Sequence, residues 1–159
     1  MKTRTILLLA AALMVSLSAC EQGSQAEPQA GAAAQTDPAV AAQAASVSLE
    51  DRIAHGKTLF ATNCSACHQA EGQGLKGAFP PLAGSDYLAQ DGGMVAVTAI
   101  LNGLSGPITV NGVEYNAVMP PVSYLSDSEV ADVVTFVLNS WGNQGGEIAS
   151  AEVAAARGL

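Results

Sequence analysis

Two cysteines and a histidine stand together in the segment Cys64-Ser65-Ala66-Cys67-His68. This C-x-x-C-H spacing is the attachment signature of c-type haem. The two thiols reach the two vinyl groups of one porphyrin and form thioethers, and the adjacent imidazole lies under the iron as its proximal ligand. The motif therefore predicts one haem c, bound covalently through Cys64 and Cys67, with His68 on the metal.

Other chemistries of this motif fit the remaining sequence less well. A structural zinc site takes four nitrogen or sulfur ligands, and the other His and Cys of the chain are His55 and Cys20. A redox-active C-x-x-C pair is expected in a strand–turn–helix setting, whereas this motif follows a helical pattern. The haem interpretation also uses all three cysteines, two for thioethers and Cys20 for a lipid.

The aromatic residues are three Phe, three Tyr and one Trp among 159 residues, and all lie between Phe60 and Trp141. Because aromatic rings dominate core burial, we expect the folded domain to span residues 48–143. So few large rings make a thin core for a domain of this size. We expect the haem to supply the missing apolar volume.

The N-terminus has the layout of an export signal. Lys2 and Arg4 precede an apolar run over residues 6–15 that is too short to span a bilayer as a helix. Residues 17–20, Leu-Ser-Ala-Cys, resemble the bacterial lipobox. In such lipoproteins a residue other than Asp after the cysteine, here Glu21, indicates the outer membrane. We predict a signal peptide over residues 1–20 ending in lipidated Cys20, with the protein anchored on the periplasmic side of the outer membrane. The alternatives are a buried helix, an uncleaved anchor, or a plain signal peptide that leaves the thiol of Cys20 idle.

Two segments outside the predicted domain have compositions typical of flexible chain. Residues 21–47 consist mainly of Ala, Gln, Ser, Pro and Gly, which bury too little surface to offset their ordering entropy. We expect a flexible linker there. Residues 144–159 are rich in Gly, Ala and Glu. Ser150 could cap one or two helical turns, but the helical propensity is weak, and we predict a flexible tail.

Two helices and a hairpin are predicted within the domain. The first helix begins near Ser48, where a weak capping box with Asp51 precedes a face formed by Ile53, Gly56, Leu59 and Phe60. The last helix begins at the capping box of Ser126 and Glu129 and stops at Gly142. Its stripe at helical spacing comprises Val130, Val133, Val134, Val137, Leu138 and Trp141. Phe136 lies off this stripe, which indicates two buried faces. Before this helix, Asn111-Gly112 predicts a small β-hairpin.

The sixth position of the iron has three candidate ligands. His55 lies within the first predicted helix, where a solvated face is its simplest location. Met94 belongs to a helical pattern, in which Met commonly fills gaps in the packing. Met119 precedes Pro120 and Pro121, which stiffen an extended loop. Because a rigid loop presents a thioether better than a helix face does, the residues favour Met119.

The order of these motifs resembles the class I cytochromes c across residues 49–143. A helix precedes C-x-x-C-H, Pro80-Pro81-Leu82 follows it, and Met119-Pro120 precedes a terminal helix. The resemblance implies an all-α fold of short helices around one covalent haem, with a small hairpin before the distal ligand Met119. It also implies that the carbonyl of Pro80 accepts a hydrogen bond from His68. It further implies that Leu82 packs on the porphyrin and that a small residue at the position of Gly56 lets the first and last helices cross closely.

The predicted ligand set indicates a one-electron carrier and not an enzyme. The His/Met ligand set raises the reduction potential, and a six-coordinate haem leaves no position for oxygen or substrate. A net charge of −8 argues against nucleic acid as a partner. The same charge fits either a basic docking face on a redox partner or the solubility of an exported protein.

The partners are expected to be redox proteins. Residues 106–116 and 140–143 are similar to cytochrome c domains found beside copper nitrite reductases, haem–copper oxidases and quinoprotein dehydrogenases. This similarity implies an electron donor or acceptor role between such periplasmic or membrane enzymes, with a nitrite reductase or terminal oxidase as a plausible recipient. We expect the protein to act as a monomer on its lipid anchor. Two alternatives stay open: a fixed electron-transfer subunit of an oxidoreductase complex, and a five-coordinate haem sensor or peroxidase in which Met119 does not bind.

Overall fold

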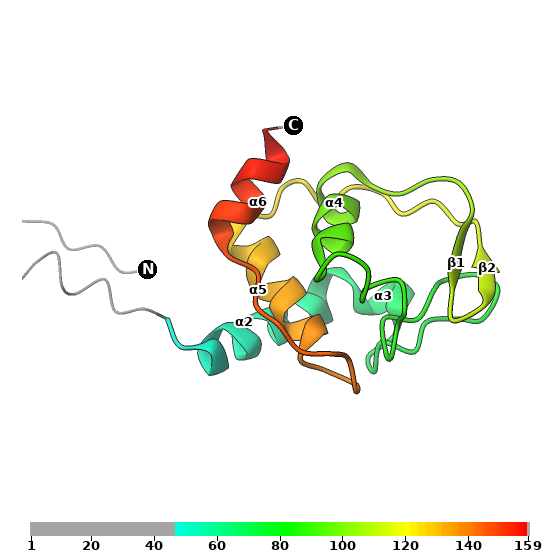
Figure 1. The fold of residues 1–159 in the computed structure, drawn as a ribbon, viewed down its shortest axis with the longest axis horizontal. Coiled ribbons are helices and arrows are strands. Elements are labelled where there is room, and N and C mark those ends of the chain that lie inside the picture. The colour runs from blue at the N-terminus through cyan, green and yellow to red at the C-terminus, as the bar shows by residue number, and fades with distance from the viewer. Residues whose placement is uncertain (1–46, 159) are drawn as a thin grey trace, which may run out of the picture. The chain divides into compact units, whose positions relative to one another are not determined.

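The computed structural model describes residues 47–158, so the predicted signal peptide, Cys20 and nearly all of the predicted linker lie outside the described residues. The elements are α2 (Leu49–Asn63), α3 (Ser65–His68), α4 (Met94–Asn102), β1 (Ile108–Val110), β2 (Val113–Tyr115), α5 (Asp127–Leu138) and α6 (Ser150–Arg157) (Figure 1). The expected helical domain with a small hairpin is confirmed. Within residues 47–158, no helix has the length and apolar character needed to cross a membrane.

Helix α2 leads into the C-x-x-C-H segment as expected. Ser48 is its N-cap, and the Ser48 hydroxyl accepts a hydrogen bond from the backbone N–H of Asp51 at 3.1 Å. Acidic residues Glu50 and Asp51 occupy the first turn, where the helix dipole favours negative charge. The helix ends at Asn63, and Cys64 is the residue between α2 and α3. Cys64, Cys67 and His68 therefore lie together at the short helix α3, directly after α2.

Helix α5 is the central helix and packs against α2, α4 and α6 (Figure 1). Every residue from Val130 to Leu138 is buried, which confirms that Phe136 and the apolar stripe belong to two buried faces. The helix ends at Leu138, so the stop predicted at Gly142 is wrong. The Asn139 and Ser140 side chains donate to the carbonyls of Thr135 and Phe136, and such local bonds compete with continued helix.

The crossing of α2 and α5 is close because Gly56 lacks a side chain. A Cβ atom at Gly56 would lie 2.1 Å from the carbonyl oxygen of Asp132. Next to this contact the ring of Phe60 lies 5.6 Å from Phe136 and 5.1 Å from Trp141, measured between centroids. The expected role of Gly56 in close packing is confirmed.

The predicted flexible tail is wrong over residues 150–157, which form α6. Two apolar side chains hold this segment: Ile148 is 3% exposed and Val153 is fully buried. The backbone N–H of Ile148 also donates to the Thr135 hydroxyl at 3.1 Å. Weak local propensity is overridden here by burial against α5 and α4.

The structure confirms the β-hairpin predicted at Asn111-Gly112. Strands β1 and β2 pair antiparallel, with Ile108 opposite Tyr115 and Val110 opposite Val113. The turn residues Asn111 and Gly112 have φ values of 51° and 75°, as a type I′ turn requires. Two reciprocal hydrogen bonds with Asp86 hold the turn. The backbone N–H of Asn111 donates to the Asp86 carboxylate at 2.7 Å, and the backbone N–H of Asp86 donates to the side-chain oxygen of Asn111 at 3.1 Å.

Candidate functional site

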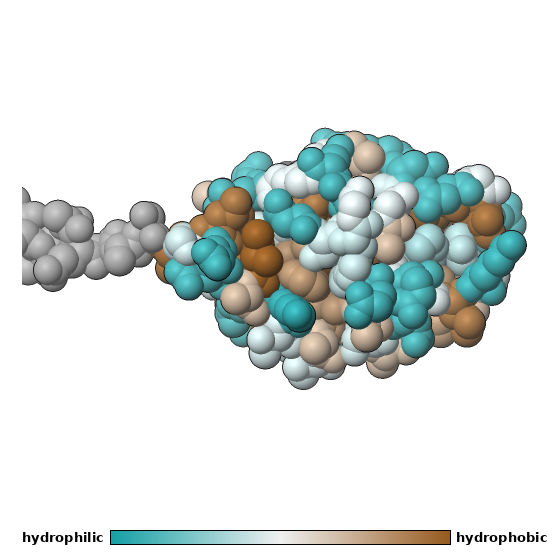
Figure 2. Space-filling view, turned by 90° about the horizontal axis from the view of Figure 1, so that it is seen from below, coloured by the Kyte–Doolittle hydropathy of each residue, from teal (hydrophilic) through white to brown (hydrophobic). Residues whose placement is uncertain are grey.

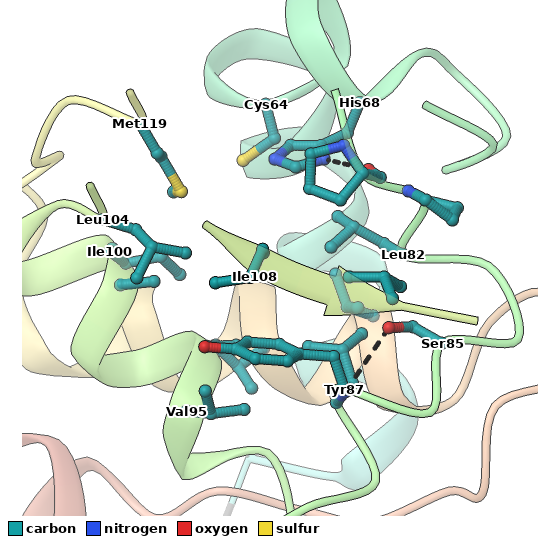
Figure 3. A pocket seen from close by; sticks show the side chains of 18 of the residues that line it. Cys64, His68, Leu82, Ser85, Tyr87, Val95, Ile100, Leu104, Ile108 and Met119 are labelled. Atoms are coloured by element: carbon teal, nitrogen blue, oxygen red, sulfur yellow. Dashed lines mark hydrogen bonds between the residues drawn. The ribbon is translucent and has the colours of Figure 1, made fainter. Parts of the chain in front are cut away.

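A pocket of about 650 Å³, partly open to solvent, lies between the C-x-x-C-H turn, the hairpin and helices α4 and α5 (Figure 3). Its wall is almost entirely apolar. The aliphatic residues that form it include Leu82, Val95, Ile100, Leu104, Ile108 and Val134. Side chains with nitrogen or sulfur ligand atoms also line it, namely Cys64, His68 and Met119, together with the hydroxyl-bearing Ser85 and Tyr87. A dry space with a few metal-binding side chains is typical of a cofactor site.

His68 is oriented by the hydrogen bond to Pro80 that the resemblance to class I cytochromes c implies. Its Nδ1 lies 3.0 Å from the carbonyl oxygen of Pro80. Because a carbonyl only accepts, Nδ1 carries the hydrogen, and the lone pair of Nε2 is left free. Burial lowers the pKa of His68, against the opposing effect of the Pro80 hydrogen bond. A neutral imidazole with a fixed ring and a free Nε2 is the form that binds a metal.

A glycine places Pro80 against His68. The backbone N–H of Gly74 donates to the His68 carbonyl at 2.9 Å. At Gly74, where φ is +64°, a Cβ would lie 2.4 Å from the Phe79 carbonyl oxygen and 2.7 Å from that of Pro80. Only glycine allows this approach without strain. The loop after the motif therefore returns the Pro80 carbonyl to the ring.

The two thiols lie on the same rim of the site. Backbone N–H groups of Cys67 and His68 donate to the Cys64 carbonyl at 3.2 and 2.9 Å, so one turn carries all three side chains. Cys64 is partly buried, and burial together with the neighbouring Cys67 raises the pKa of Cys64 to about 11. Cys67 is exposed and lines an adjoining pocket with His68, Pro80 and Met119. Neither cysteine is in a disulfide bond, and Cys64 lines the main pocket while Cys67 lines the adjoining one.

Met119 enters the same space from a different segment of chain (Figure 3). Its backbone pairs with Leu104, whose carbonyl accepts from Met119 N–H at 2.8 Å and whose N–H donates back at 2.9 Å. A Cβ at Gly103 would lie 2.7 Å from the Met119 carbonyl, so this pairing also depends on glycine. Pro120 and Pro121 follow directly.

The other two candidate ligands lie elsewhere. Met94 begins α4 and packs against the hydrophobic core. His55 Nδ1 lies 2.9 Å from the Asp132 carboxylate, with half of the His55 side chain exposed. Of the three candidates, Met119 alone lines the pocket. Leu82, the residue expected against the porphyrin, lines it as well.

Sequence reasoning missed several polar residues that support the site. The Asn143 carboxamide donates to the carbonyls of Leu82 and Val137 at 2.9 and 2.8 Å, and it accepts from Ser85 N–H at 3.3 Å. Tyr124 donates to Asn63 at 2.7 Å, which links the segment after Met119 to the residue before Cys64. No local sequence signal identifies these pairs, because their partners are distant in the chain.

The donor set fits a covalent haem and does not fit a metal ion bound by protein alone. Within residues 47–158, no group of three or more His, Cys, Asp or Glu side chains could hold a metal ion. What the site offers is one imidazole, one thioether, two thiols and an apolar wall. These groups match the needs of haem c, with thiols for attachment, nitrogen and sulfur for the iron, and dry surface for the porphyrin.

Comparison with known proteins agrees with this geometry. The cytochrome c family model matches residues 53–141. Cytochrome c-552 of Thermus thermophilus is 43% identical over 93 residues, which are 57% of this chain and 70% of that protein. The cytochrome c subunit of the quinone-dependent alcohol dehydrogenase of Gluconobacter oxydans is 36% identical over 89 residues, or 55% of this chain and 18% of the subunit. The gluconate 2-dehydrogenase cytochrome c subunit of Pantoea cypripedii is 32% identical over 90 residues, again 55% of this chain and 20% of the subunit.

Proposed function

This chain belongs to the cytochrome c family, whose members carry electrons on a haem attached covalently through the Cys pair, and on that premise we propose that it holds its iron between His68 and Met119. The observation that supports this ligand pair best is the shared pocket. An oriented imidazole from α3 and a thioether from the loop after β2 face one apolar space. The proposal makes the protein a one-electron carrier with both axial positions filled by its own side chains.

Each residue of the site has a distinct task in this proposal. The haem supplies reversible one-electron oxidation and reduction. The Pro80 carbonyl keeps His68 oriented, and this bond increases the basicity of the ring nitrogen that faces the metal. Met119 favours the reduced state, because a thioether ligand raises the reduction potential. The apolar wall excludes water, and Leu82 packs on the cofactor face.

Substitution of Met119 tests the ligand pair. In haem-loaded Met119→Ala we expect loss of the sulfur-to-iron charge-transfer absorption, a lower reduction potential and binding of carbon monoxide to the ferrous protein. Met94→Ala is the matched control, because Met94 is a partly buried methionine of α4 outside the pocket. An unchanged spectrum and potential in Met119→Ala, or the full set of changes in Met94→Ala, would refute the assignment.

The electron partner is proposed to be a redox enzyme of the cell envelope, with a nitrite reductase, terminal oxidase or dehydrogenase as its class. A second candidate is a fixed subunit of a dehydrogenase, which the similarity to two dehydrogenase cytochrome c subunits favours. This chain aligns with about a fifth of each of those subunits. A mobile carrier is expected to purify alone and as a monomer from gently solubilised membranes, whereas a fixed subunit is expected to purify with the dehydrogenase.

We also propose that Cys20 carries lipid and anchors the protein to the periplasmic side of the outer membrane. The support is the sequence of residues 1–21. Fractionation of cells that express the wild type and Cys20→Ser tests this location. The wild type is expected in the outer-membrane fraction, and the variant is expected to lose that attachment. An equal distribution of both proteins contradicts the proposal.

A further inference from the structure

Helix α6 lies beyond the residues that the family model matches, yet it contacts the segment that follows Met119. The match ends at residue 141, and α6 ends at Arg157. The Arg157 guanidinium forms an ion pair with Asp127 at 2.7 Å. It also donates to the carbonyls of Ser123 and Leu125 at 3.1 and 2.7 Å. Ser123 and Leu125 lie between Met119 and α5, and Asp127 is the first residue of α5.

The chain between Met119 and these carbonyls is stiff. Pro120 and Pro121 have restricted φ angles, and Val122 N–H donates to the Ile100 carbonyl at 2.7 Å. Met119 itself is paired with Leu104. The segment between Met119 and residue 123 can therefore absorb little of a displacement of residues 123–125, and the displacement is passed on to Met119.

Helix α6 provides a firm base for the arginine. Val153 is fully buried, and the Glu152 carboxylate accepts from Ala149 N–H at 2.7 Å at the start of the helix. The planar guanidinium presents several donors in a rigid fork, which suits one side chain that binds two carbonyls and a carboxylate. A lysine ammonium would lack this geometry.

We propose that Arg157 is a positioning residue for the distal ligand, holding the backbone of residues 123–125 so that Met119 stays on the haem iron. The inference rests on the proposed His68/Met119 ligation. It assigns to α6 a role in ligand retention in addition to packing. It predicts that loss of the guanidinium makes the Met119 bond easier to displace.

Arg52 offers a matched control. Its guanidinium donates to Asp132 at 2.6 Å, to Glu147 and to the Ile148 carbonyl at 2.6 Å. It therefore fastens the same C-terminal segment to α2 and α5 through a similar set of acceptors, and none of these hydrogen bonds or ion pairs reaches residues 116–125. Removal of Arg52 loosens the tail without touching the Met119 segment.

The test is titration of the ferric haem-loaded protein with imidazole, which competes with Met119 for the iron. Loss of the sulfur-to-iron absorption reports displacement. We expect Arg157→Ala to raise the apparent imidazole affinity by roughly three- to tenfold, as loss of carbonyl hydrogen bonds of ordinary strength allows. Arg157→Lys is expected to fall between the wild type and Arg157→Ala. Arg52→Ala is expected to keep the wild-type affinity, with its thermal unfolding measured beside that of Arg157→Ala.

An unchanged affinity in Arg157→Ala, or an equal rise in Arg52→Ala, overturns the role of Arg157 and leaves the ligand assignment intact. Absence of the sulfur-to-iron absorption in the wild type overturns the His68/Met119 ligation, and the inference falls with it. The wild-type spectrum therefore separates a failure of the proposed function from a failure of this inference.

Discussion

Gly56 shows how one residue determines the distance between two helices. The space for a side chain is absent, because Phe136 Cβ would lie 2.7 Å from a Cβ at this position, in addition to the Asp132 carbonyl at 2.1 Å. On the same turn of α5, the Asp132 carboxylate pairs with Arg52 at 2.6 Å and with His55 at 2.9 Å. Burial opposes the charge of Arg52, but its hydrogen bonds to Asp132 and Glu147 raise its pKa overall.

Replacement of Gly56 tests this contact. Gly56→Ala is expected to lower the free energy of unfolding by about 1–3 kcal/mol, because the added methyl group forces α2 and α5 apart. Denaturant unfolding of the haem-loaded protein measures the change. Gly158→Ala is the control, since a Cβ there meets no atom closer than 3.7 Å and its φ is −83°. Equal stability of Gly56→Ala and the wild type would contradict the close crossing.

Helix α5 shows how a local motif begins an element. Ser126 is its N-cap, and the reciprocal bonds of the capping box are both present: Glu129 N–H donates to the Ser126 hydroxyl at 3.3 Å, and Ser126 N–H donates to the Glu129 carboxylate at 2.8 Å. Hydrogen bonds from the Ser126 hydroxyl and backbone hold the pKa of Glu129 below its ordinary value of 4.5. The charged carboxylate is therefore the form that stabilises the helix start.

The lowered pKa of Glu129 predicts a pH-dependent contribution to stability. A carboxyl group whose pKa is lower in the folded state stabilises the fold above its unfolded-state pKa, and this stabilisation is lost as the pH falls through the folded-state value. The wild type is expected to be more stable than Glu129→Gln at about pH 7, and the difference is expected to shrink at an acid pH below the lowered pKa of Glu129. Thermal unfolding at both pH values measures it, beside Glu114→Gln on the exposed side of β2 as control. A difference that persists at acid pH would speak against the capping carboxylate.

At the scale of the described domain, the core is incomplete without the cofactor. Val95, Leu104 and Ile108 line the pocket, and the buried core residues Ile100 and Val134 contribute to its wall. Exposure of this apolar wall to water costs about 25 cal/mol for each Å² left uncovered. On the face shown in Figure 2, hydrophilic residues predominate and the apolar ones gather in small patches. The wall of the pocket is an apolar surface that a haem would cover.

Removal of both attachment thiols tests this dependence. Cys64→Ala/Cys67→Ala is expected to give a chain without a cooperative thermal transition, because haem is neither retained nor available to fill the pocket. Circular dichroism during heating measures the transition. Ser65→Ala, a change within the same motif that keeps both thiols and His68, is expected to fold with haem. A cooperative transition in the haem-free double variant would show that the side chains form a sufficient core alone.

Patterns that act within a few residues were predictable from the sequence. The C-x-x-C-H turn, the caps at Ser48 and Ser126, and the Asn111-Gly112 hairpin each depend on neighbours in the chain, so their residues identify them. The cofactor follows from the same local spacing. The bond between His68 and Pro80 came from family resemblance, since the residues alone indicate only a loop at Pro80.

Contacts between distant residues were decided only by the tertiary structure. Residues 150–157 have weak helical propensity, yet the burial of Val153 orders them as α6. The bonds of Asn143 to Leu82 and of Arg157 to Ser123 and Leu125 join segments that local sequence patterns do not relate. The physical reason is that capping and turn preferences are properties of neighbouring residues, whereas burial and long-range hydrogen bonds exist only after the chain has brought their partners together.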